Sequence, residues 1–222
     1  HDKAAQAFGQ CLSLNQRLGR NEAAISCLIN LGKCAADSGD TRTAKHNYLL
    51  ALRQSRRRYD TQREAIARLN LSEVFLLENR PDLCQRCCEE ALRQFEEIGH
   101  RVGIADANRI LGCAAQQRGD HYTAFTCLEK SISCNRQTGY RLGEAESLRD
   151  YGRFLVLADQ ESGSGREHLA EAHTIFSELG ISREVEAIDD LLGTTKREPA
   201  PSERDGGSGP PPVQEPVPSG VL

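Results

Sequence analysis

The stretch LGKCAADSGDTRTAKHNYLLALRQ, residues 31–54, returns twice in altered form at intervals of 40 residues. Its counterparts are LSEVFLLENRPDLCQRCCEEALRQ at residues 71–94 and LGCAAQQRGDHYTAFTCLEKSISC at residues 111–134. A fourth, more divergent copy starts at Tyr151 and carries one inserted residue, and a partial copy lies upstream, where Cys11-Leu12 aligns with Ala51-Leu52. A period of this length indicates an array of stacked structural repeats.

The aligned positions describe a helix-packing surface. Two columns, seven residues apart, hold small side chains, and a column of larger apolar side chains lies between them. The small columns are Ala44, Cys84, Ala124 and Ala51, Ala91, Ser131, Ala172; the larger one is Tyr48, Cys88, Leu128, Leu169. Offsets of four and three place all of them on one helix face, where small residues let two helices approach closely.

Two further columns mark turns. One is Gly39, Asn79, Gly119 and Asp159; the other is Gly19, Gly99, Gly139 and Gly180, with Tyr59 as the exception. Gly, Asn and Asp best tolerate a left-handed turn conformation. Pro81 suits the first position of a helix, and Thr61-Gln-Arg-Glu64 matches a capping box that opens another. Each copy therefore predicts a helix, a tight turn, a second helix and a second turn.

The sequence thus predicts an all-α, right-handed superhelix of about four helix–turn–helix repeats. The array covers residues 1–192, with a partial repeat at 1–20, repeats at about 21–60, 61–100, 101–140 and 141–180, and a closing helix at 182–192. The individual helices are expected at about 3–18, 22–38, 42–58, 62–78, 82–98, 102–118, 121–138, 142–158 and 165–179, within two to four residues. Residues 193–222 hold seven of the eight prolines, and we expect them to form a disordered tail.

This pattern resembles the tetratricopeptide repeat (TPR) family. The residues that carry the resemblance are Leu31-Gly32, Ala44, Tyr48 and Ala51 in one repeat, Leu71, Phe75, Cys84 and Ala91 in the next, and Leu111-Gly112, Ala124 and Leu128 in the third. The usual TPR period is shorter, and the 40-residue variant is similar to the repeats of kinesin light chain, of G-protein-signalling modulators and of bacterial multidomain regulators. The resemblance implies a solenoid that presents an extended concave surface.

Nine cysteines occur, three of them in LCQRCCEEAL at residues 83–92. Cys84 and Cys88 fall in core columns, where cysteine acts as a small apolar residue. Cys11 and Cys27 also fall in small-residue columns, whereas Cys87 and Cys127 share a column at the edge of the packed face. No second CxxC or HxxxH pair completes a zinc site. We therefore interpret these cysteines as packing residues in a reducing, cytoplasmic setting rather than as a metal or redox site.

Composition and motifs exclude several functions. The formal charge of −4 gives no electrostatic case for nucleic-acid binding, and the cluster Arg53, Arg56, Arg57 and Arg58 is interpreted as a solvated helix end. No apolar run is long enough to span a bilayer. No GxSxG, HExxH or Walker-type sequence is present, so we expect neither catalysis nor a bound cofactor.

The resemblance also implies a site. In TPR proteins the first helix of each repeat lines the concave surface, and an asparagine before the Leu-Gly pair often holds a peptide backbone. That column here is Asn30, Asn70, Ile110 and Asp150. Neighbouring columns complete the peptide-groove candidates, which are Asn30, Lys33, Asn70, Glu73, Arg109, Arg149 and Arg153. The alternative interpretation is that these are ordinary polar residues on helix surfaces.

The first functional hypothesis is a protein-interaction scaffold that binds a peptide or partner helix, with acidic side chains facing Arg149 and Arg153. The second is a regulatory or sensory C-terminal segment of a larger signalling protein, such as a kinase, a cyclase or an ATPase-coupled regulator. The partial first repeat and the absence of methionine favour the second. A cysteine-based metal or redox protein is the third.

Overall fold

The computed structural model describes residues 2–158 and 163–194 and contains only α-helices within them. The helices are α1 (Asp2–Arg17), α2 (Asn21–Asp37), α3 (Thr41–Arg57), α4 (Thr61–Leu77), α5 (Pro81–Glu97), α6 (Arg101–Gln117), α7 (His121–Thr138), α8 (Arg141–Ala158), α9 (Ser164–Glu178) and α10 (Ser182–Thr194). No predicted helix end lies more than two residues from the observed one. Gly193 and Thr194 belong to α10 rather than to the predicted tail, and residues 195–222 and Asp159 lie outside the described residues.

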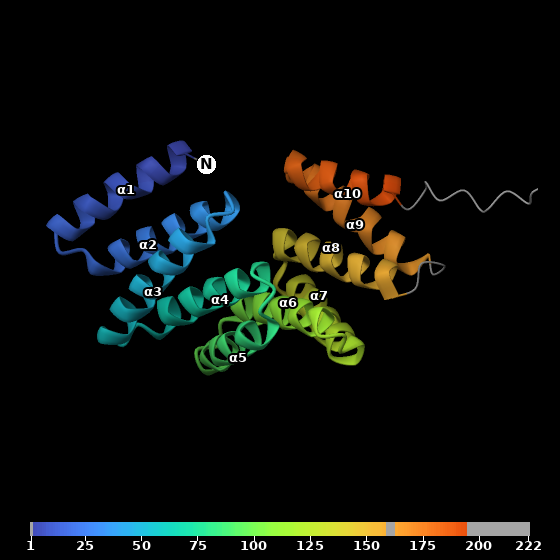
Figure 1. Ribbon diagram of the computed structural model, residues 1–222, viewed down its shortest axis with the longest axis horizontal. Helices are drawn as coiled ribbons and strands as arrows, with labels where there is room; N and C mark the ends of the chain where they lie inside the picture. The colour runs from blue at the N-terminus through green and yellow to red at the C-terminus, as the bar shows by residue number, and fades with distance from the viewer. Residues whose placement is uncertain (1, 159–162, 195–222) are drawn as a thin grey trace, which may run out of the picture.

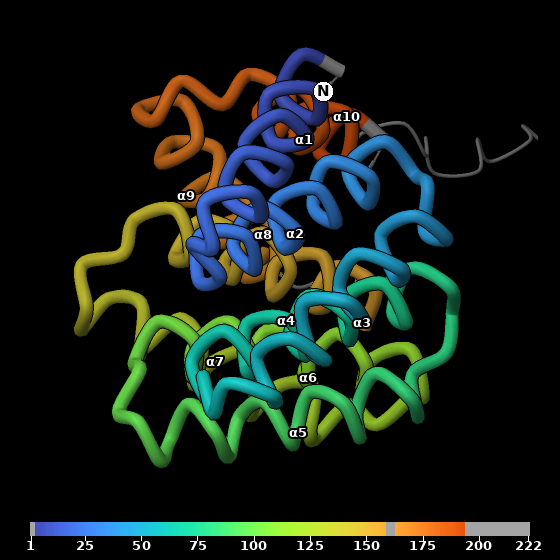
Figure 2. The backbone as a smooth tube through the Cα atoms, turned by 90° about the vertical axis from the view of Figure 1, so that its left-hand side faces the viewer, coloured from blue at the N-terminus to red at the C-terminus, as the bar shows by residue number. Residues whose placement is uncertain are grey.

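Consecutive helices pack in pairs, and the pairs stack into an arch (Figure 1). The two ends of the arch are formed by α1 and by α10, and α5 lies at its lowest point in both views (Figures 1 and 2). Direct contacts also join α2 to α4, α4 to α6 and α6 to α8. These even-numbered helices, together with α10, form an inner row along the concave side, and the odd-numbered helices form an outer row. The fold is the all-α solenoid that the sequence predicts.

The turns confirm the phase of the repeats. Every glycine of the two turn columns has a positive φ, from 67° at Gly19 and Gly99 to 82° at Gly39. Asn79 has φ 55°, and Tyr59 has φ 56°, so Tyr59 adopts the same left-handed turn despite its side chain. Tyr59 is therefore an exception in residue type only. A β-carbon in this conformation carries a steric cost of roughly 1–2 kcal/mol.

Polar side chains cap the N-termini of several helices. The cap of α4 lies one residue before the predicted Thr61. Asp60, and not Thr61, caps α4, because its Oδ1 accepts a hydrogen bond from the Arg63 backbone nitrogen at 3.0 Å. Glu64 does not close a capping box; its Oε1 accepts hydrogen bonds from Arg56 and Arg68. Asp40 and Asp120 cap α3 and α7 in the same way as Asp60. Asp binds the free N–H groups of a first helical turn directly, which is why it replaces Thr as the cap.

The predicted core columns are buried throughout. Ala44, Cys84, Ala124, Ala51, Ala91, Ser131 and Ala172 have no exposed surface, and the larger column is at most 2% exposed. Cys11 is the exception to the predicted burial. It lies on α1, which packs only against α2, and its side chain is exposed.

The two rows interlock at a glycine column. A β-carbon on Gly32 would lie 2.4 Å from the Tyr48 ring, and one on Gly112 would lie 2.7 Å from Leu128 Cγ. The second repeat places Ser72 in this column, and Ser72 is fully buried with its hydroxyl donating to the Leu69 carbonyl at 2.6 Å. Its partner across the rows is Cys88, which is the smallest residue of the larger column. Cys88 thus compensates for the volume of Ser72, which explains a cysteine at this position.

Candidate functional site on the concave face

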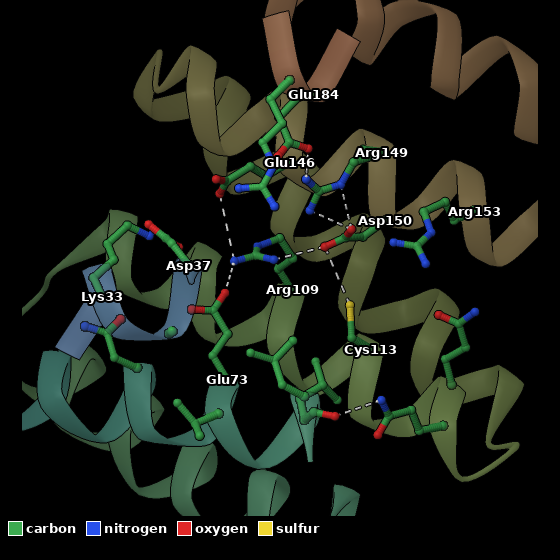
Figure 3. A pocket seen from close by; sticks show the side chains of 18 residues that line it. Lys33, Asp37, Glu73, Arg109, Cys113, Glu146, Arg149, Asp150, Arg153 and Glu184 are labelled. Atoms are coloured by element: carbon green, nitrogen blue, oxygen red, sulfur yellow. Dashed lines mark hydrogen bonds and ion pairs between the residues drawn. The ribbon is translucent and has the colours of Figure 1, made fainter. Parts of the chain in front are cut away.

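A hollow of about 780 Å³ lies on the concave side of the arch. All five inner helices contribute to its walls, from Lys33 on α2 to Glu184 on α10 (Figure 3). The regular 40-residue period explains this arrangement, because it returns the same inward-facing positions of each inner helix to the same side of the array.

Six of the seven predicted groove residues line this hollow: Lys33, Asn70, Glu73, Arg109, Arg149 and Arg153. Asn30 does not. It lines a second hollow of about 1110 Å³, together with Ser26, Tyr59 and Arg63. The structure therefore brings the residues of α4, α6 and α8 together and leaves Asn30 on the N-terminal side of them.

Arg109 lies at the centre of the hollow and is held by three carboxylates from two neighbouring helices (Figure 3). Its guanidinium is 2.9 Å from Glu73 Oε1 on α4, 3.0 Å from Asp150 Oδ2 on α8 and 3.8 Å from Glu146 Oε2. Only 12% of the side chain is exposed. Burial opposes the charge of Arg109, but the carboxylates outweigh it and raise its pKa well above the usual value. Arg109 is thus an internal link between α4, α6 and α8.

Arg149 extends this link to the end of the arch. Its guanidinium lies 2.9 Å from Asp150 Oδ1 and also bonds to Glu184 on α10. Burial disfavours ionised Asp150, but Arg149 and Arg109 outweigh it and lower the pKa of this carboxyl below its usual value. The chain Glu73–Arg109–Asp150–Arg149–Glu184 therefore connects α4, α6, α8 and α10, and leaves little of either guanidinium for a ligand.

The carboxyl group of Asp106 lies at the edge of this cluster and makes no hydrogen bond within the described residues. Burial raises the pKa of Asp106 to about 6. The negative charges of Glu146 and Glu73 add to this rise, and the positive charge of Arg109 opposes it. Burial and the neighbouring carboxylates thus outweigh the attraction of Arg109 and Lys33 for ionised Asp106. The site consequently holds a titratable group close to neutral pH.

Other polar groups in the hollow are uncommitted. Four side chains make no hydrogen bond or ion pair with residues 2–158 or 163–194. They are Lys33 and Asn70 at one side of the hollow and Arg153 and Arg183 at the other. Arg153 is drawn without a partner in Figure 3. Its exposed guanidinium and that of Arg183 are free to bind an anionic group.

Arg183 was absent from the predicted site residues. It lies on α10, which we treated as a closing helix outside the repeats, although α10 occupies the place of a fifth inner helix. Leu76, Leu77 and Asp37 also line the hollow and were not predicted. All three lie near the C-terminal ends of their helices, beyond the aligned columns from which the groove residues were predicted.

Two of the three cysteines in the stretch of residues 83–92 belong to the core. Cys84 and Cys88 have no exposed surface, and burial raises the pKa of the Cys84 thiol to about 12. Cys87 is partly buried, and its Sγ donates to the Arg68 carbonyl at 3.4 Å. Within the described residues, no group of three or more His, Cys, Asp or Glu is arranged to hold a metal ion. In the same part of the chain, every helix is too short or too polar to cross a lipid bilayer.

Comparison with known proteins agrees with the fold. No protein-family model matches the chain. A curated relative, the heat shock protein sti1 homolog of Schizosaccharomyces pombe, is 27% identical over 166 residues, which cover 73% of this chain. The chain spans only 27% of the length of that relative.

Two solved structures share the architecture. BtubC (BKLC) from P. vanneervenii has a TM-score of 0.59 and 14% identity, covering 97% of this chain and 96% of that one. A Podospora anserina putative kinesin light chain with nearly identical TPR-like repeats has a TM-score of 0.54 and 12% identity, covering 81% and 88%. The chain therefore has a TPR-like helical repeat fold, with a period of 40 residues, as the resemblance in its sequence implies.

Proposed function

We propose that the chain is a protein-interaction module whose concave face holds an extended segment of a partner protein. The proposal rests on one observation: within the hollow, the ion-paired side chains are separate from those that have no partner in the described residues. The middle is occupied by the Arg109 and Arg149 ion pairs, whereas Asn70 lies free at one side and Arg153 and Arg183 lie free at the other.

The chemistry of these groups indicates the kind of segment. The Asn70 amide both donates and accepts, which matches the two polar groups of a peptide bond. Two unpaired arginines favour a carboxylate further along the same segment. Leu76 and Leu77 add apolar side chains to the lining of the hollow. TPR-like solenoids present such concave surfaces over several repeats, which supports an elongated ligand rather than a compact one.

A peptide selection tests this proposal. A random peptide library displayed on phage is selected against the full chain, and the affinity of a selected peptide is measured by calorimetry. Arg153→Gln with Arg183→Gln should weaken binding roughly tenfold, and Asn70→Ala by about 1 kcal/mol. The matched control is Arg86→Gln with Arg93→Gln, which removes the same charge from exposed positions of the outer helix α5.

The control pair should bind as the parent does. If the Arg153 and Arg183 variant also binds as the parent does, while its circular dichroism is unchanged, the peptide does not use this hollow. Arg149→Glu is unsuitable as a test, because Arg149 joins α8 to α10 and its loss would alter the array itself.

A further inference from the structure

The outer helix α3 carries an unusual concentration of positive charge. Its 17 residues include Arg42, Lys45, Arg53, Arg56 and Arg57 and no acidic residue. The next outer helix, α5, carries five acidic and two basic residues over the same length. Because both helices occupy equivalent places in consecutive repeats, the difference is a property of α3 and does not follow from the repeat pattern.

The charges of α3 form a stripe on its outward side. Arg42, His46, Leu49, Arg53 and Arg57 follow one another at intervals of four, three, four and four residues, and all five side chains are exposed. The stripe is about 22 Å long at the rise of an α-helix. Leu49, 52% exposed, lies in its middle and gives it one apolar contact point.

The arginines at the C-terminal end of this stripe are not neutralised by the chain. Lys45 and Arg56 are ion-paired, with Glu78 and Glu64 respectively. The side chains of Arg53, Arg57 and the following Arg58 make no hydrogen bond or ion pair within the described residues. Three guanidiniums within six positions therefore repel one another unless a ligand or counterions lie between them.

The surrounding charge distribution indicates which ligand fits. Residues 1–60 contain 10 basic and 5 acidic residues, whereas residues 61–194 contain 15 basic and 23 acidic ones. A long polyanion such as duplex DNA would be repelled by the larger, negative part of the array. A short acidic segment reaches only the positive part and is steered to it. The aromatic side chains that stack on bases are also absent from the stripe.

We propose that the outward face of α3 is a second interaction surface, which binds an acidic segment of a partner protein. About seven extended residues span the stripe, at the usual length per residue. Carboxylates of that segment bind Arg53, Arg57 and Arg58, and an apolar side chain contacts Leu49. This surface is separate from the concave hollow, to which α3 contributes no residue.

A fluorescently labelled peptide of seven glutamates is the probe, with the full chain as the binding partner and fluorescence anisotropy as the readout. We expect binding at about 50 mM NaCl that is lost at about 500 mM, because salt screens exposed charges. Arg53→Gln with Arg57→Gln should weaken binding about tenfold. Arg86→Gln with Arg93→Gln removes the same charge from exposed positions of α5 and should change affinity less than about twofold.

Three results would overturn the proposal. The first is equal loss of affinity in the α3 and α5 variants, which means that net charge and not a surface binds the probe. The second is loss only in Arg153→Gln with Arg183→Gln, which places the acidic ligand in the concave hollow. The third is tighter binding of duplex DNA or of phosphatidylserine vesicles through Arg53 and Arg57, which assigns the surface to another class of partner.

Discussion

Two arginines on the inner row of this solenoid and two on the outer row have opposite states. Arg109 and Arg149 on the inner row are mostly buried and ion-paired with side chains from neighbouring repeats. Arg53 and Arg57 on the outer row are exposed and unpaired within the described residues. The difference arises because Arg109 and Arg149 reach carboxylates of neighbouring inner helices, whereas the side chains of Arg53 and Arg57 extend into solvent. The row alone does not decide the state of a charge, since Arg136 on outer helix α7 is paired with Glu171. A charge stabilises the array where a carboxylate of a neighbouring helix lies within reach and is otherwise available to a partner.

The largest expected effect comes from removing the central inner charge. Arg109→Met leaves Glu73 and Glu146 without their cation and Asp150 with Arg149 alone, and it should destabilise the array by about 3–5 kcal/mol. Arg53→Met on the outer row should change stability by less than about 0.5 kcal/mol. Urea unfolding followed by circular dichroism measures both, and equal stabilities of the two variants would remove the distinction between the rows.

The interlock between the rows can be broken next. Cys88→Leu overfills the space that Ser72 already occupies and should cost about 1–3 kcal/mol. Adding Ser72→Gly recreates the pairing of Gly112 with Leu128 and should recover most of that loss. The measurement is a double-mutant cycle in urea. A double variant no more stable than Cys88→Leu alone would show that the two residues are not coupled.

A pH dependence distinguishes the inner cluster from the outer stripe. The pKa of Asp106 is raised to about 6, so its folded state binds a proton more readily than the unfolded chain. Stability should therefore fall as the pH rises from about 4 to above 6. Asp106→Asn should remove that fall and stabilise the chain by about 1–2 kcal/mol at pH 7.5, with no gain near pH 4. A gain that is the same at both pH values would show that the charge of Asp106 is not the cause.

The smallest effect concerns the turn beside the outer stripe. Tyr59→Gly relieves a left-handed conformation at a side chain that is 93% exposed, and it should stabilise the chain by about 1 kcal/mol. Tyr122→Gly is the matched control, because Tyr122 is 81% exposed but lies within α7. That change should destabilise by about 1 kcal/mol. Thermal melts of the two variants should shift in opposite directions.

The fold could be predicted because several local signals shared one period. The turn residues near Gly39 and Asn79 and the small residues near Ala44 and Ala51 each repeat every 40 positions, and each constrains the same backbone. The capping box at Thr61 was wrong because two adjacent residues, Asp60 and Thr61, could both cap, and only the backbone geometry distinguishes them. The predicted burial of Cys11 was wrong. Residues of its column are covered only where a second neighbouring helix packs on them.

The candidate site was less predictable from the sequence. The inward-facing positions followed from the repeat phase, and six of the predicted residues line one hollow. Which of these side chains are ion-paired and which are free did not follow from the repeat phase. Glu73 and Asp150 lie 36 and 41 positions from Arg109, so they are its neighbours by period, but which rotamers meet depends on the distance between inner helices. Sequence alone gave Arg109, Arg149 and Arg153 alike as groove candidates. In the structure the first two are ion-paired, whereas the side chain of Arg153 has no partner within the described residues.

The most direct test of this contrast is the exchange of arginine Nε–H protons, observed by nitrogen-15 NMR at neutral pH. The Nε atom of Arg109 is buried and that of Arg149 bonds to Asp150 Oδ1 at 3.0 Å, so both protons should exchange slowly and give resolved signals. Those of Arg53 and Arg57 should exchange with water too quickly to be seen. Single substitutions assign each signal. If the Arg109 proton exchanges as fast as that of Arg53, the inner arginines are as free as the outer ones, and the division of roles between the rows is contradicted.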